Sequence, residues 1–138
     1  MRSRFIRVSG RERGAVAVEF ALVATLLLTV LLGILQYGYH YWALETASAT
    51  AREAARKYAV GTEQACTQAK AEEHAGTAAL GPVTVSPRPS GMKVGDVITV
   101  TVSFQSLDMH LFPLPGGGVV TQSEKARVES VPDSPRPC

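Results

Sequence analysis

The sequence predicts an α+β protein with a long N-terminal helix, a shorter second helix and a small antiparallel sheet. Two patterns carry this prediction. Residues 15–60 contain no proline and are first almost entirely apolar and then rich in alanine, which is typical of a continuous helix. Residues 96–105 instead alternate apolar and polar side chains, which is the pattern of a half-buried strand.

The stretch from residue 15 to 35 is long and apolar enough to cross a bilayer. A helix of this length spans ~30 Å, the thickness of the hydrocarbon core. Glu19 is the only Asp, Glu, Lys or Arg within it. The hydroxyls of Thr25 and Thr29 can donate to backbone carbonyls one turn earlier, so the helix tolerates them. We therefore expect a single transmembrane helix in the segment 15–42.

Charge is divided unevenly along the chain. Five arginines and one glutamate give residues 1–14 a net charge of +4, so the remainder carries −2 of the formal total of +2. Basic residues beside a span stay on the cytoplasmic side. We expect a single-pass protein of the cytoplasmic (inner) membrane with an extracytoplasmic C-terminal domain. Membrane lipid is then a partner, whereas the small total charge does not favour nucleic acid.

Aromatic residues mark the far end of the apolar run. They are Tyr37, Tyr39, Tyr41 and Trp42. Amphipathic rings favour the lipid headgroup layer, so these side chains predict a membrane-interface belt. A cleaved secretory signal is the alternative, because the small residues Ala47–Ala49 resemble a cleavage site. The apolar run is longer than a typical signal sequence and the belt separates it from that site, which favours the span.

Residues 43–61 are expected to continue the helix outside the membrane, with Gly61 as its stop. Alanines recur there at every fourth position, at residues 43, 47, 51, 55 and 59. Two interpretations stay open. Small side chains let another helix approach closely, but an alanine-rich helix of high propensity can also face solvent.

Residues 62–131 should form a small α+β domain, followed by an irregular, proline-rich tail at 132–138. The domain begins with a helix over about residues 63–75, which Gly76 and then Gly81-Pro82 end. Strands are expected over 82–86, 96–105 and 119–131. Packing of the sheet against the long helix would bury its alternating valines.

Cys66 and Cys138 are the two cysteines of the chain. An exported domain would lie in an oxidising compartment, which permits a disulfide between them. Two unrelated thiols are the alternative, and the sequence does not decide between the two.

The sequence offers little for catalysis. His40, His74 and His110 have no second metal ligand at helical spacing and no Cys/His cluster around them. The glycine run at 116–118 lacks the Lys-Ser/Thr of a phosphate-binding loop, and there is no Gly-x-Ser-x-Gly motif. We expect no enzymatic activity, no metal site and no cofactor.

The segment "RERGAVAVEFALV", residues 11–23, resembles the class III signal of type IV prepilins. It has basic residues, a glycine, small apolar residues, a glutamate, a phenylalanine and then the apolar run. With "LLGILQYGYHYW" and "AREAARKYA" following in order, residues 11–60 resemble the TadE family of pseudopilins from tight-adherence (Flp) pilus systems. The resemblance implies a pilin-like fold and a role in a pilus used for adhesion.

Several residue roles follow from the resemblance alone. It implies that a prepilin peptidase recognises Gly14, Ala15, Glu19 and Phe20 and cuts between Gly14 and Ala15. It also implies that Glu19 pairs with the Ala15 amine of a neighbouring subunit. The implied partners are the peptidase, other pilin and pseudopilin subunits and the pilus assembly platform. The alternative is an uncleaved single-span anchor that displays a small binding domain, with Glu19 reaching the headgroups.

The sequence departs from the family pattern at two places. Many relatives carry a proline where Ala24 and Thr25 stand, so a helix kink expected there is missing. An acidic residue is common at the aromatic exit, where this chain has Gln36. The exported part is also larger than a major Flp pilin needs, which favours a minor or accessory pseudopilin.

Overall fold

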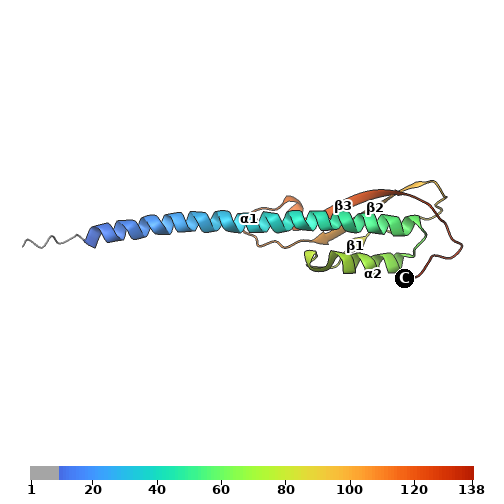
Figure 1. Cartoon of the computed structure of the whole chain (residues 1–138), viewed down its shortest axis with the longest axis horizontal. Helices are drawn as coiled ribbons and strands as arrows, with labels where there is room; N and C mark the ends of the chain where they lie inside the picture. The colour runs from blue at the N-terminus through green and yellow to red at the C-terminus, as the bar shows by residue number, and fades with distance from the viewer. Residues whose placement is uncertain (1–9) are drawn as a thin grey trace, which may run out of the picture. The chain divides into compact units, whose positions relative to one another are not determined.

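The computed structural model describes residues 10–138, with side chains from residue 14 onward. The first nine residues of the expected leader lie outside the described residues. The chain divides into two units, Met1–Ile34 and Leu35–Cys138. The expected α+β class is confirmed, and Figure 1 shows its helices and strands. In chain order they are α1 (Gly10–Ala59), α2 (Gln64–Ala75), η1 (Gly76–Ala78), β1 (Thr84–Val85), β2 (Val97–Gln105), η2 (Pro115–Gly118) and β3 (Val119–Arg127).

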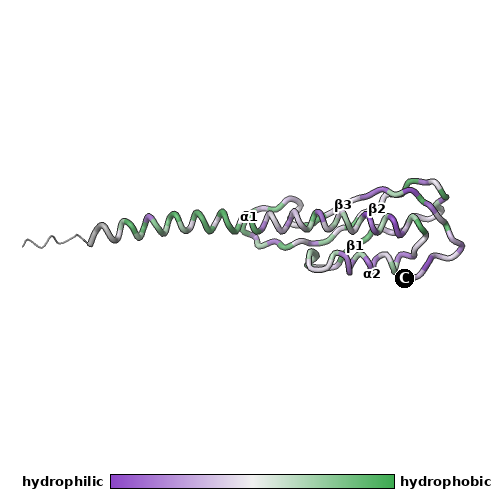
Figure 2. Tube along the Cα trace, in the orientation of Figure 1, coloured by the Kyte–Doolittle hydropathy of each residue, from purple (hydrophilic) through white to green (hydrophobic). Residues whose placement is uncertain are grey.

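Helix α1 runs without a break through both its apolar and its alanine-rich part, which confirms the expected continuous helix. It shows no interruption at Ala24 and Thr25. The hydroxyls of Thr25 and Thr29 donate to the carbonyl oxygens of Ala21 and Thr25 at 2.8 Å, as expected for hydroxyls in an apolar helix. Figure 2 shows that the apolar residues are concentrated in the first part of α1.

Gly61 ends α1 in the way the sequence predicts. Its backbone adopts φ 87°, in the left-handed region that favours glycine. The Gly61 N–H donates to the Tyr58 carbonyl and the Thr62 N–H donates to the Lys57 carbonyl, which together form a Schellman motif. A side chain at Gly61 would also collide with the ring of Pro132. Only glycine therefore fits this turn.

The three strands form one antiparallel sheet in the order β1-β2-β3. Strand β2 pairs with β3 along its whole length, for example Val100 with Glu124 and Phe104 with Val120. Alternate residues of β2 are buried, and they are Ile98, Val100, Val102 and Phe104. The alternation predicted from the sequence is confirmed.

Two expected strands are shorter in the structure than in the prediction. The segment 82–86 forms only Thr84–Val85, because Pro82 and Pro87 on either side cannot donate to a ladder. The third strand ends at Arg127 rather than 131. Its continuation turns away instead, and the N–H groups of Glu129 and Ser130 donate to the Ala59 carbonyl at the end of α1.

The alanine line of α1 forms the centre of the hydrophobic core. Each of its five members is at most 3% exposed, so the interpretation of a solvent-facing helix is wrong. Four of them, at positions 43, 47, 51 and 55, cluster with inward residues of the sheet and with Ala71 and Ala75 of α2. The small side chains therefore allow close approach, but they do so to elements of the same chain. In Figure 1, α2 and the sheet lie along this alanine-rich part of α1.

The C-terminal tail is irregular, as expected, but the structure fastens it. Cys66 and Cys138 form a disulfide with their Cα atoms 5.2 Å apart. Close by, Arg136 pairs with Thr62 in an isolated parallel bridge, and its N–H donates to the Gly61 carbonyl at 2.9 Å. The tail is thus bonded to the connection between α1 and α2 and to the start of α2.

Tyr58 is part of the hydrophobic core near the C-terminal end of α1. Its side chain is fully buried, and its hydroxyl donates to Gln64 Oε1 at 2.6 Å. Burial raises the pKa of Tyr58 to about 12, although the nearby Arg88 charge and the Gln64 hydrogen bond oppose this shift. The phenol therefore stays neutral through the physiological range.

Substitution of Ala47 should show how tightly α1 packs. Ala47 is 0% exposed, so Ala47→Leu should lower the free energy of unfolding by about 1–3 kcal/mol through overpacking. Ala49 is exposed on the same helix, and Ala49→Leu should change that free energy by less than about 0.5 kcal/mol. Denaturant unfolding of the full chain in detergent micelles measures both. Equal effects of the two substitutions would contradict the packing described here.

Candidate functional site

The four residues implied in peptidase recognition lie on the first part of α1. Gly14, Ala15, Glu19 and Phe20 are all exposed, and Phe20 is 73% exposed. A side chain built at Gly14 would meet no atom within 4 Å. Packing inside the described chain therefore does not require a glycine at position 14, and any requirement must come from a partner.

Helix α1 exposes a predominantly apolar surface from Val16 to Leu35. All of its large apolar side chains are exposed, most of them by half or more. An 18-residue window of this part has a mean hydropathy of 2.5 and none of it is buried. Soluble monomers rarely expose contiguous apolar patches larger than a few hundred Å². The length and composition of this segment indicate membrane anchoring.

Glu19 is the one carboxylate on that apolar surface. The ion pairs that the structure shows among residues 14–138 all lie beyond residue 51, so none of them involves Glu19. An ionised group inside hydrocarbon is costly without a partner. The Glu19 carboxylate on this apolar surface would therefore be stabilised by a positively charged partner.

The four aromatic residues of the expected belt divide into two pairs. Tyr37 donates its hydroxyl to the carbonyl oxygen of Pro113 in the β2–β3 loop, and Tyr39 donates to that of Thr77 in η1. Tyr41 is 66% exposed and Trp42 is 46% exposed. The rings of Tyr39 and Trp42 also stack edge to face, with centroids 5.2 Å apart. Half of the belt therefore also fastens α1 to the loops around it.

Gln36 has a structural role that sequence reasoning missed. Its side chain is 0% exposed, and its amide group donates to the Phe112 carbonyl at 2.8 Å and to Asp108 Oδ1 at 3.2 Å. Its carbonyl oxygen in turn accepts from the Phe112 N–H at 3.2 Å. Gln36 thus holds the loop 106–114 against the residue that directly follows the apolar run. An acidic residue here could not donate these two bonds.

His40 continues this polar connection one turn later. It is 3% exposed, and its Nδ1 atom lies 2.9 Å from Ser106 Oγ. The Ser106 hydroxyl donates to the Gly118 carbonyl at 2.9 Å, so the imidazole donates to the hydroxyl. His40 stands between two belt residues in the sequence, yet the structure buries its side chain. The spacing of Gln36, His40, Ala43 and Ala47 could have shown this, because they share one helix face.

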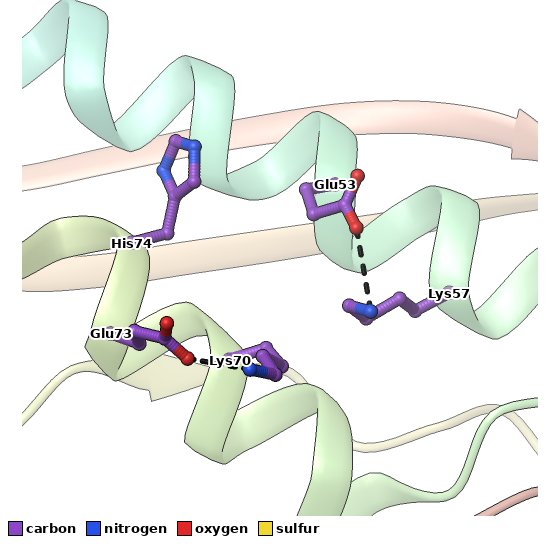
Figure 3. Close-up of a pocket in the computed structure, with 5 residues that line it drawn as sticks. All are labelled: Glu53, Lys57, Lys70, Glu73 and His74. Atoms are coloured by element: carbon purple, nitrogen blue, oxygen red, sulfur yellow. Dashed lines mark hydrogen bonds and ion pairs between the residues drawn. The ribbon is translucent and has the colours of Figure 1, made fainter. Parts of the chain in front are cut away.

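A shallow groove of about 540 Å³ lies between α1 and α2 and carries mixed charges. Its lining residues, drawn in Figure 3, are Glu53, Lys57, Lys70, Glu73 and His74. Lys57 pairs with Glu53 at 3.4 Å and Lys70 with Glu73 at 2.7 Å. The hydrogen bond and the charge of Lys70 lower the pKa of Glu73.

The lysine and glutamate side chains of this groove are paired with each other. His74 Nδ1 lies 3.1 Å from the Thr50 hydroxyl, which already donates to the Thr46 carbonyl. No group of three or more His, Cys, Asp or Glu gathers in the part of the chain that the structure describes. The groove therefore has no arrangement that points to catalysis or metal binding.

Comparison with known proteins finds one family. The family model described as TadE-like protein matches residues 14–56. Residues 14–56 are TadE-like. No curated protein and no solved structure matches the chain. The match confirms the expected resemblance over these residues and supports a protein associated with the Tad pilus.

The whole TadE-like match falls within α1. It covers the exposed apolar part with Glu19, the aromatic belt and most of the alanine face. The sheet, α2 and the disulfide lie beyond the matched residues. The TadE-like helix therefore has two parts: its apolar side chains before Gln36 are exposed, and its alanine face after Gln36 is packed against the rest of the domain.

Loss of the Gln36 amide should release the loop that it holds. Gln36→Leu would leave partly buried polar groups of Phe112 without partners at a cost of about 1 kcal/mol or more, which should raise the exchange rate of the Phe112 amide about tenfold. Hydrogen exchange of the full chain in micelles measures this rate. Gln122→Leu on β3 is the matched control and should leave exchange in the loop unchanged. Equal rates in wild type and Gln36→Leu would show that Gln36 does not fasten the loop.

Proposed function

We propose that this protein is a minor pilin or pseudopilin that a prepilin peptidase processes and that acts in assembly of a tight-adherence pilus used for adhesion. The observation that carries the proposal is the exposed apolar part of the TadE-like helix with a single carboxylate on it. Such a surface needs lipid before assembly and neighbouring helices after it. Helix packing and recognition by the peptidase are its mechanism.

Processing between Gly14 and Ala15 would remove the basic leader. The absence of packing around Gly14 supports a role for this glycine in contact with another protein. A peptidase pocket that closes tightly on the backbone would admit only a residue without a side chain. The Gly14–Ala15 peptide lies inside α1, so the peptidase would need a locally unwound helix.

Cleavage would also create the partner that Glu19 lacks. The new amine on Ala15 would carry a positive charge, and Glu19 lies one helical turn, about 6 Å, further along. A charged side chain at the bilayer centre costs roughly 2.5–3.5 kcal/mol, and less near the interface. Pairing of Glu19 with the Ala15 amine of a neighbouring subunit would relieve this cost inside a membrane or a filament.

The proposed topology places the leader in the cytoplasm and residues 43–138 outside the membrane. The arginines before the span support this orientation. The disulfide between Cys66 and Cys138 supports an oxidising compartment for the domain. The size of this domain favours a minor or accessory subunit over a major pilin.

An uncleaved anchor that displays a small binding domain is the second candidate. The exposed apolar helix fits it equally well, whereas the position of Glu19 one turn from Ala15 favours the pilin. Processing distinguishes the two.

Substitution of Gly14 should block processing. Gly14→Val places a branched side chain at the proposed cleavage site, and we expect the uncut precursor to accumulate in native membranes with little mature protein. Gly38→Val is the matched control, because a side chain there also meets no atom within 4 Å. Immunoblotting of membrane fractions separates the two forms. Normal processing of the Gly14→Val chain would contradict cleavage at this site.

Substitution of Glu19 should separate insertion from assembly. Glu19→Leu removes the carboxylate and raises hydropathy, so we expect normal membrane insertion but loss of the subunit from sheared pili. Thr25→Leu, another polar-to-apolar change on the exposed part of α1, should leave incorporation unchanged. Quantitative blotting of membrane and pilus fractions measures both. Normal incorporation of the Glu19→Leu chain would show that the charge pair is not needed.

A further inference from the structure

The loop between β2 and β3 carries an uncharged surface that the pilus role does not use. Residues 109–123 contain no Asp, Glu, Lys or Arg, and neither do residues 35–44 of α1. The structure brings these two uncharged segments together. We call the exposed side chains of Tyr37, Tyr41, Leu111 and Pro115 the loop–belt surface. Leu111 is 48% exposed and Tyr41 66% exposed.

Hydrogen bonds fix the loop at a defined height along α1. Gln36 binds both backbone groups of Phe112, and the Tyr37 hydroxyl donates to the Pro113 carbonyl at 2.9 Å. Gln36 directly follows Leu35, the last residue of the apolar run. The loop is therefore bonded to the two residues that directly follow the apolar run.

A groove joins three members of this surface, Tyr37 and Tyr41 of α1 and Pro115 of the loop. This shallow groove of about 520 Å³ lies between α1 and the start of β3. Tyr37, Tyr41 and Leu44 line it from α1, and Pro115, Gly116 and Val119 line it from the other side. Exposed aromatic and apolar side chains thus extend from the helix onto the loop without a charged residue between them.

The acidic group next to this surface is turned into the protein, whereas the neighbouring His110 side chain is 86% exposed. The Asp108 side chain is 17% exposed and accepts hydrogen bonds from Gln36 and from the His110 N–H. His110 has φ 55°, and its Nε2 atom lies 3.9 Å from Asp108 Oδ2. The acidic group of the loop is therefore drawn toward the protein, while Leu111 stays outside.

We infer that the loop–belt surface binds the lipid headgroup and upper acyl layer of the membrane that α1 crosses. Each polar layer of a bilayer is about 5–7 Å thick, and Tyr37 to Tyr41 rises about 6 Å along a helix. A loop fastened at Gln36 and Tyr37 then lies at the boundary between hydrocarbon and headgroups. Tyrosine rings and a projecting leucine are suited to this depth.

This second contact would restrain the exported domain at the membrane. A single helix leaves the attached domain free to tilt and rotate, whereas a helix and a loop together give two points of contact. The restraint would last while the subunit is in the bilayer and would end when it leaves for a filament. The inference rests on the membrane span of the proposed function, but not on processing or on the pairing of Glu19.

The experiment uses the full chain in lipid vesicles with tryptophan as a depth reporter. Trp42 is the only tryptophan, so Trp42→Phe gives a silent background. Leu111→Trp then reports on the loop, Leu27→Trp on the span and Val94→Trp, at a site 67% exposed in the β1–β2 connection, on the rest of the domain. Vesicles with brominated acyl chains quench tryptophans that reach the lipid.

We expect strong quenching and a blue-shifted emission for Leu27→Trp and Leu111→Trp, and neither for Val94→Trp. Quenching of Leu27→Trp without quenching of Leu111→Trp would overturn the loop contact and leave the span intact. No quenching at either position would overturn both. A blue shift of Leu111→Trp without quenching would mean that protein, such as a second copy of the chain, covers the surface.

A measurement on the unsubstituted chain guards against disturbance of the loop by tryptophan. In bilayer nanodiscs, a paramagnetic label on lipid headgroups should broaden the amide signals of Leu111 and Phe112 but not that of Val94. Unbroadened signals at Leu111 and Phe112 would contradict the inference.

Discussion

The close packing of the alanine face of α1 is the constraint on which the rest of the structure depends. Ala43, Ala47, Ala51 and Ala55 are almost completely buried, and their short side chains let the sheet and α2 approach the helix. The valines of β2 and the Schellman turn at Gly61 complete this arrangement. Because all of these partners come from residues 43–138, the apolar part before Gln36 has no cover within this core.

One helix therefore serves two environments. Its packed part obeys the rules of a soluble core, in which small residues allow close contact and buried polar groups are hydrogen-bonded. Its exposed part has the composition of a membrane span, with Glu19 as the exception. Gln36 and His40 stand at the change between the two, where they bind the loop that ends at η2. We regard this junction as the feature that fixes where the C-terminal domain begins.

Much of the architecture could be predicted from periodicity and turn residues. The continuous helix, its end at Gly61, α2 and the alternation of β2 all follow from local patterns that the structure keeps. Burial of the alanine line could not be predicted from the sequence, because an alanine-rich helix suits both a solvent-exposed face and a close helix interface. The roles of Gln36 and the tail depend on contacts between residues more than 70 positions apart, such as Gln36 with Phe112 and Cys66 with Cys138. Local sequence does not encode such pairs, and β3 was overextended for the same reason.

The intact mass and N-terminal sequence of the protein from its native membrane test the proposed pseudopilin most directly. We predict a mature chain that begins at Ala15, since this end both removes the basic leader and supplies the amine for Glu19. A mature chain that retains residues 1–14 would contradict the proposal and leave an anchored binding domain. A chain that begins near Thr50 would also contradict it, because secretion would then have removed the exposed apolar helix.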